Sequence, residues 1–144
     1  MHLSKILCPL DFSGAAVPLL AYAAAMAEAT GAELCLLHVQ EPQLALNGSM
    51  PVPDAALELA RYRLLAEQAG ARRVTTQLCQ GDADREIVRV AQRSGADLIV
   101  IGSHGHTGLT RFLMGNTAEH VVRHAPCATL LVKPHGDAAY RQSA

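Results

Sequence analysis

The sequence lacks the features that mark several large classes of protein. Lys and Arg (12) nearly balance Asp and Glu (13), and the formal net charge is -1. There is therefore no basic excess of the kind that nucleic-acid-binding proteins carry. No apolar run reaches the length of a membrane-spanning helix, and residues 1–10 contain no long apolar core of a signal peptide. These absences predict a cytoplasmic protein that binds neither nucleic acid nor membrane.

The four cysteines also lack a recognisable functional spacing. Cys8, Cys35, Cys79 and Cys127 form no C-x-x-C pair and no zinc pattern. Three of them fall in or at the end of strand-like runs, which favours small buried side chains in a reducing compartment. A redox role for Cys127 is the alternative.

Short apolar runs alternate with longer helical patterns along the chain. Half of the residues are hydrophobic, which excludes a disordered chain, and 144 residues suffice for one domain with a core. We expect that domain over residues 1–135, followed by a disordered tail at 136–144. The expected strands cover residues 3–10, 33–39, 73–79, 97–101 and 128–133. The expected helices cover residues 13–30, 54–69, 82–94 and 116–124.

Two of the expected helices have features that can be checked directly. Asp54 is placed to cap the second helix, and its expected inward face carries Leu57, Ala60, Leu64 and Leu65. In the third helix, the expected inward residues are Ile87, Val90 and Ala91.

The repeated strand–helix order predicts an α/β fold with right-handed crossovers and a parallel sheet. The runs "LIVI" and "TLLV" are apolar without alternation, which is typical of strands covered on both faces. We therefore predict a three-layer, doubly wound, Rossmann-like sheet. Such sheets bind ligands at the carboxyl ends of their strands, where the strand order reverses. The loops at residues 9–13 and 102–115 are unusual and lie at such ends.

The second of these loops is rich in glycine. Gly102, Gly105, Gly108 and Gly115 occur within fourteen positions, directly after an apolar run. The stretch has no lysine after its last glycine, so it is not a Walker loop. It follows the fourth expected strand, so it is not the dinucleotide fingerprint either.

Gly115 directly precedes the fourth expected helix. The first N–H groups of a helix lack internal partners, and its dipole favours an anion there. The alternative is a glycine-rich turn with ordinary capping, in which Asn116 and Glu119 form a variant of the capping box.

The spacing G-x-x-G-x(9)-G at Gly102, Gly105 and Gly115 resembles the ATP-binding signature of the universal stress protein family. "ILCPLDFS" at 6–13, "LLHV" at 36–39 and the whole of 102–133 are similar to the same family. The resemblance covers almost the entire chain. It implies a five-stranded sheet in the order 3-2-1-4-5, with ATP as ligand, accompanied by magnesium. AMP or cyclic AMP would suit the same pocket.

The resemblance also implies roles for individual residues. Asp11 and Val39 would border the adenine, with Pro9 beside Asp11. Gly102 and Gly105 would lie along the ribose and the phosphates. A cap or turn role for Asp11 is the alternative.

The phosphate tail would be held at Gly115, Asn116 and Thr117. The family usually has Ser or Thr directly after the last glycine, where this chain has Asn116. Either the amide of Asn116 or the hydroxyl of Thr117 can take the ligand.

Other residues near the glycine loop give less direct signals. His104 and His106 could bind a metal or be exposed loop histidines, but no third ligand stands at useful spacing. Arg111 could reach a phosphate or be solvated. No nucleophile–base pair stands out, and Asp11 is the only nearby carboxylate to consider for a metal.

These observations favour a stress-response regulator that acts through nucleotide-dependent interactions with an unidentified protein partner. One alternative is a stress protein that works by protein contacts alone, without nucleotide. Another is a slow ATPase, against which the missing base and lysine argue.

The last expected strand, residues 128–133, would be an edge of a sheet ordered 3-2-1-4-5. Its run "ATLLV" is apolar and carries no charge or proline until Lys133 and Pro134. An uncovered edge of this kind invites pairing, and a two-fold axis would join two copies into one sheet. We therefore predict a homodimer, which the family resemblance also implies. The alternative is that the tail from His135 covers the edge.

Overall fold

The computed structural model describes residues 2–42, 54–103 and 115–133. Within them, five strands form one parallel sheet in the order β3-β2-β1-β4-β5. The strands are β1 (Lys5–Pro9), β2 (Glu33–Gln40), β3 (Val74–Gln80), β4 (Leu98–Gly102) and β5 (Ala128–Val132). The helices are α1 (Ala16–Thr30), α2 (Ala55–Gln68), α3 (Ala83–Ser94) and α4 (Asn116–His124). The predicted fold class and strand order are therefore confirmed.

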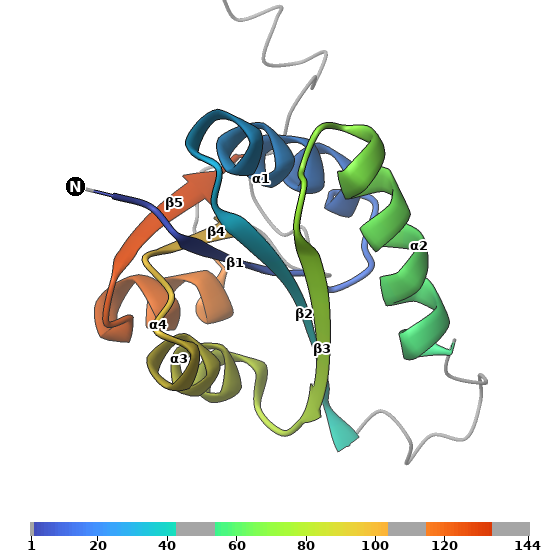
Figure 1. Ribbon diagram of the computed structural model, residues 1–144. Coiled ribbons are helices and arrows are strands. Elements are labelled where there is room, and N and C mark those ends of the chain that lie inside the picture. Colours follow the sequence, from blue (N-terminus) through green and yellow to red (C-terminus); the bar gives the residue numbers. More distant parts are fainter. Residues whose placement is uncertain (1, 43–53, 104–114, 134–144) are drawn as a thin grey trace, which may run out of the picture.

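The helices form two layers, one on each face of the sheet. Helices α1 and α2 cover one face, and α3 and α4 cover the other (Figure 1). Successive strand residues point to opposite faces, so Ile6 and Leu36 join the core under α1 and α2. Leu7 and Leu37 join the second core, under α3 and α4. Strands buried on both faces explain the unbroken apolar runs in the sequence.

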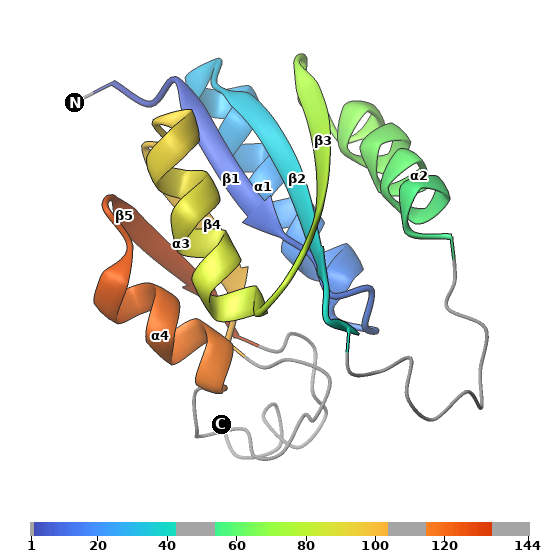
Figure 2. The ribbon, with the colours of Figure 1, turned by 90° about the horizontal axis from the view of Figure 1, so that it is seen from below.

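The direction of winding reverses at β1. The chain runs from β1 outward through β2 to β3, and then returns to the other side of β1 to form β4 and β5 (Figure 2). Because all five strands are parallel, their carboxyl ends lie at one edge of the sheet. The switch point at which such folds bind ligands therefore falls between β1 and β4.

The opposite ends of β1 and β4 are fastened by Asp97. Its Oδ2 accepts hydrogen bonds from Ser4 N (2.9 Å), Ser4 Oγ (2.9 Å) and Lys5 N (3.0 Å). The backbone N–H of Asp97 donates to Lys5 O at 2.8 Å. The hydrogen bonds from Ser4 and Lys5 stabilise the carboxylate and lower the pKa of Asp97.

Helix α2 corrects one prediction from the sequence. Asp54 does cap it, since its Oδ1 accepts from Ala56 N (3.1 Å) and Leu57 N (3.3 Å). The predicted inward face is wrong, however, because Leu57 and Leu64 are 68% and 58% exposed. Ala60 and Leu65 are exposed as well. The residues that face the core are Ala55, Leu59, Tyr62 and Ala66.

That buried set recurs at intervals of four, three and four residues, which is one stripe of a helix. Leu59, Tyr62 and Ala66 of this stripe belong to the core shared with α1 and the sheet. The predicted set, Leu57, Ala60, Leu64 and Leu65, also recurs at helical spacing, so the period alone could not decide between the two faces. In α3, by contrast, Ile87, Val90 and Ala91 are buried as predicted.

The cysteines behave as packing residues. Cys8 and Cys35 are buried in the sheet, and burial raises the pKa of both thiols. Burial, together with the nearby Asp97 carboxylate, also raises the pKa of Cys127. A raised pKa disfavours the reactive thiolate, which argues against the redox alternative for Cys127. Among the helices of the described ranges, none is long and apolar enough to cross a membrane.

Candidate functional site

The loop after β1 places Asp11 at the carboxyl edge of the sheet. Pro9 ends β1 beside Leu37 of β2, and Leu10 N extends the pairing by donating to Leu37 O at 2.7 Å. Asp11 is half-buried, and its Oδ1 accepts from Ser13 N at 3.0 Å. The turn role considered for Asp11 is therefore present. It uses one carboxylate oxygen and leaves Oδ2 without a hydrogen bond among the described residues.

Phe12, next to Asp11, has a backbone φ of 62°. This left-handed conformation is unfavourable for a bulky side chain and persists only where surrounding contacts hold it. The contacts are aromatic: the Phe12 ring stacks on His38 at 3.9 Å and lies nearly parallel to Tyr62 at 5.7 Å between centroids. His38 also donates from Nδ1 to Leu10 O at 2.7 Å, since a carbonyl can only accept.

The aromatic stack joins the β1 loop to β2 and α2, and so fixes the position of Asp11. Sequence reasoning missed Phe12, His38 and Tyr62 because they are far apart in the chain. The one available signal was a bulky residue between the turn formers Asp11 and Ser13. Val39 follows His38 in β2, is half-buried, and packs against the second core.

The glycine loop is closed at its base by the backbone of Ser103. Ser103 O accepts from Gly115 N at 2.7 Å, and Ser103 N donates to Val132 O at 3.0 Å. Gly102, the last residue of β4, pairs with Val132 of β5. The end of β4 and the start of α4 therefore meet at the carboxyl edge. The predicted site residue Gly105 lies outside the described residues, as do His104, His106 and Arg111.

Helix α4 begins without a side-chain cap. Gly115 is the N-cap, with φ -65° and ψ 159°, and no side chain of the described residues caps the helix by a hydrogen bond. The capping-box alternative for Asn116 and Glu119 is therefore wrong. Gly115 holds the N-cap conformation, so Asn116 is already the first helical residue. Asn116 is exposed and Thr117 is half-buried.

An uncapped helix start can hold an anion. The N–H groups of Asn116, Thr117 and Ala118 have no carbonyl partner within α4, because they belong to its first turn. The helix dipole places partial positive charge at the same point. The φ of Gly115 is one that any residue adopts, so the backbone does not require glycine there. A close approach by another group would explain why a side chain is absent.

Seven of the eight predicted site residues are described, and each lies at the carboxyl end of β1, β2 or β4 or at the start of α4: Pro9, Asp11, Val39, Gly102, Gly115, Asn116 and Thr117. The edge thus combines a half-buried carboxylate beside β1 with an uncapped helix start after β4. Within the described part of the chain, no group of three or more His, Cys, Asp or Glu side chains could hold a metal ion.

Comparison with known proteins gives a consistent picture. Residues 2–133 match the universal stress protein family. A universal stress protein of Methanocaldococcus jannaschii is 32% identical over 139 residues, which cover 90% of this chain and 81% of that protein. The solved structure of MJ0577, a hypothetical protein of the same organism, is 28% identical with a TM-score of 0.81, and the match covers 95% of this chain and all of that one.

Two further solved structures resemble the fold and carry nucleotides. A universal stress protein in complex with cAMP has a TM-score of 0.76 at 20% identity, covering 93% of this chain and 99% of that one. A universal stress protein of Archaeoglobus fulgidus in complex with dAMP has a TM-score of 0.70 at 23% identity, covering 92% of this chain and all of that one.

Proposed function

The chain belongs to the universal stress protein family, and from that premise we propose that it binds an adenine nucleotide at the carboxyl edge of its sheet. ATP is the proposed form, and the nucleotide state would control contacts with a partner protein in a stress response. The four cysteines are free thiols, which fits action in the reducing cytoplasm.

The observation that carries this proposal is the uncapped start of α4. No side chain in the described ranges caps its first N–H groups, and the hydrogen bond from Gly115 N to Ser103 O fixes them beside the end of β4. A phosphate tail would satisfy these donors and meet the favourable end of the dipole. Thr117 adds a hydroxyl, and Asn116 adds an amide that can donate.

The adenine would lie toward the β1 side of the same edge. Pro9, Val39 and Gly102 would offer apolar or bare backbone surface to the ring and the ribose. The turn uses only Oδ1 of Asp11. Its Oδ2 would contact the adenine side of the ligand. The cAMP and dAMP complexes of structurally similar proteins support an adenine ligand in this fold.

Magnesium would have to rely largely on the nucleotide itself. The described residues contain no cluster of three acidic, histidine or cysteine side chains. Magnesium usually keeps several waters and binds through one or two carboxylates plus substrate phosphates. The residues present fit that pattern, with Asp11 or Thr117 as protein ligands. The ion would screen the phosphate charge, and this chain would orient the tail.

Mass spectrometry of ligand released from the denatured, purified protein tests the proposal first. Calorimetry with ATP, AMP, cyclic AMP, adenosine and GTP then tests it quantitatively. We expect an adenine nucleotide to be released or to bind more tightly than GTP. Absence of both results would refute adenine-nucleotide binding.

Two variants of Asp11 separate base recognition from the turn. Asp11→Ala removes both, and loss of one buried polar contact costs about 1–3 kcal/mol. Asp11→Asn keeps an acceptor for Ser13 N and removes only the charge. If Asp11 contacts the adenine side, both variants lose discrimination between ATP and GTP. If only Asp11→Ala loses discrimination between ATP and GTP, Asp11 acts by holding the turn and makes no contact with the base.

The edge position of β5 supports a homodimer. Among the described strands, β5 pairs with β4 alone, and its residues from Thr129 to Val132 are half-buried. We propose that two copies pair their β5 strands across a two-fold axis. Leu131→Pro should give a monomer, because proline removes a strand donor. Light scattering at micromolar concentration measures the molar mass. A monomer mass for the unmodified protein would refute the proposed dimer.

A further inference from the structure

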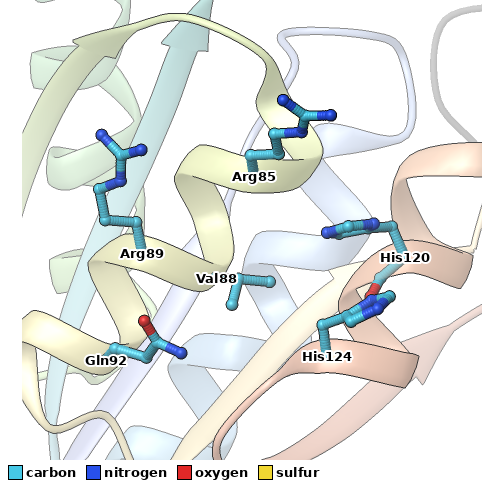
Figure 3. A pocket seen from close by; sticks show the side chains of 6 residues that line it. All are labelled: Arg85, Val88, Arg89, Gln92, His120 and His124. Carbon is cyan, nitrogen blue, oxygen red and sulfur yellow. The ribbon is translucent and has the colours of Figure 1, made fainter.

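A groove with a positively charged lining lies between α3 and α4 on the outer surface of their layer (Figure 3). Its volume is about 360 Å³. The lining consists of four residues of α3 and two of α4: Arg85, Val88, Arg89, Gln92, His120 and His124. No acidic side chain is among them. The predicted nucleotide site contributes none of these residues, so the groove needs its own explanation.

The two arginines differ in how far they are committed to other contacts. The Nη1 of Arg89 lies 3.4 Å from Glu86 Oε2, on the same helix. Arg85 is exposed and makes no ion pair within the described ranges. A guanidinium presents a planar set of donors that matches the oxygens of a phosphate or carboxylate. Arg85 can therefore offer its full set of donors to an anion.

The two histidines face the groove from successive turns of α4. Their rings stack with centroids 4.2 Å apart. In Figure 3 the His120 ring points towards α3, whereas the His124 ring lies along α4, beside the backbone of His120. His124 Nδ1 donates to His120 O at 2.9 Å, because the carbonyl can only accept. The Nε2 of neutral His124 thus carries a lone pair. Protonation converts it to a second donor and gives the ring a positive charge.

The charged groups named around the neutral histidines cancel in number, but the lining of the groove itself holds Arg85 and Arg89 and no acid. Asp84 Oδ2 lies 3.8 Å from His120 Nδ1, and Glu119 pairs with Arg123 at 3.7 Å. On α3, Glu86 forms an ion pair with Arg89. Strand β5, which also packs against α4, has no charged residue. Asp84 can therefore balance a proton on His120, whereas no ion pair joins His124 to an acid among the described residues, so a proton on His124 adds charge that an incoming anion can balance.

We propose that the groove binds a small anion carrying phosphate-type groups, and that binding takes up a proton on His124. The volume is at the low end of the roughly 300–1,000 Å³ of small-molecule pockets, which favours a small solute. Arg85 and Arg89 supply permanent charge, and the Gln92 amide adds a neutral donor. The ligand is either an inorganic phosphate or a phosphate ester, since both offer the same oxygens.

Calorimetry with inorganic pyrophosphate between pH 8 and 6 is the first test, with glycerol 3-phosphate as the second probe. Tighter binding of pyrophosphate would indicate an inorganic phosphate as the ligand, and tighter binding of glycerol 3-phosphate would indicate a phosphate ester. Affinity should rise on acidification, by up to about tenfold per pH unit for each proton taken up. Binding with an affinity that falls on acidification, or no binding at millimolar concentration, would overturn the proposal.

Variants locate the binding. Arg85→Gln and His124→Gln should each weaken pyrophosphate by about tenfold. The steeper pH dependence should disappear in His124→Gln, while the ionisation of the probe itself is common to all variants. Arg63→Gln on α2 removes the same formal charge elsewhere on the surface and should bind normally. Circular dichroism should be native throughout, because all three side chains are exposed.

The nucleotide site could bind pyrophosphate too, and His124→Gln separates the two. His124 lies eight residues after Asn116, about 12 Å along α4, so it is remote from the helix start. Unchanged affinity in both Arg85→Gln and His124→Gln would assign the anion to the start of α4 and refute the groove. Failure of ATP to bind would leave the groove proposal standing.

Discussion

Replacing Gly115 by serine should make the protein more stable and, at the same time, weaken its binding of ATP. Gly115 is the N-cap of α4, and its φ of -65° and ψ of 159° suit any residue. A serine there would place its hydroxyl where it can accept from the N–H groups of Thr117 and Ala118. These are the same donors that we propose for the phosphate tail. The added side chain therefore competes with the ligand.

The gain in stability has two parts. Replacing glycine where the native backbone is compatible reduces unfolded-state entropy and contributes about 0.4–1 kcal/mol. A serine cap contributes a few tenths of a kcal/mol more than a glycine cap, for a total of about 1 kcal/mol. The unfolding entropy of about 2.1 cal/mol/K per residue gives about 0.3 kcal/mol/K for this chain. The Tm should therefore rise by about 3 °C.

The loss in binding follows from the donors removed. Hydrogen bonds to a charged group contribute about 1.5–3 kcal/mol, so ATP should bind about tenfold to a hundredfold more weakly. Adenosine lacks phosphates and should bind as it does to the unmodified protein. Calorimetry with both ligands and a thermal scan without ligand measure the three quantities.

A matched control is available at Gly14. This glycine has ordinary backbone geometry, and a Cβ added there would meet no atom within 4 Å. Gly14→Ser should raise the Tm through unfolded-state entropy alone and leave ATP affinity unchanged. If Gly115→Ser binds ATP as tightly as the unmodified protein does, the phosphate is not held at the start of α4. A lower Tm would show that the N-cap reasoning is wrong.

Three further predictions concern other parts of the structure. His38→Ala removes the donor to a backbone carbonyl and the stacking partner of Phe12, so urea unfolding should show a loss of about 1–3 kcal/mol; an unchanged midpoint would mean that the stack contributes little. Leu59→Ala should cost about 2–5 kcal/mol in the same assay, whereas Leu57→Ala should stay within about 0.5 kcal/mol, and equal losses would contradict the observed face of α2. Asp97→Asn should lower the Tm at pH 7, because the pKa of Asp97 is lowered by folding and its contribution is present above the unfolded value of about 3.9. The contribution of Asp97 is lost as pH falls through the folded pKa, so the difference in Tm should shrink below about pH 4; a constant difference would argue against the charged carboxylate as the cause.

Local pattern determined the elements of this protein and their order. Helix α4 occupies residues 116–124 as predicted, because Gly115 marks its start and Ala125-Pro126 mark its end. The cap of α2 at Asp54 was predicted for the same reason, since an N-cap needs only the residues that follow it. The parallel sheet followed from the alternation of strand and helix. Strand order, by contrast, was predicted from family resemblance, because apolar periodicity contains no information on which strands are neighbours.

Tertiary packing decided the rest. The buried face of α2 carries Ala55 and Ala66, whereas Leu57 on an equally regular stripe is exposed, so packing against the sheet decided the face. Phe12 keeps its strained backbone because His38 and Tyr62, from β2 and α2, stack beside it. The groove between α3 and α4 exists because two helices that follow different strands lie side by side on one face. Contacts between residues remote in sequence depend on three-dimensional placement, and no local period in the sequence encodes it.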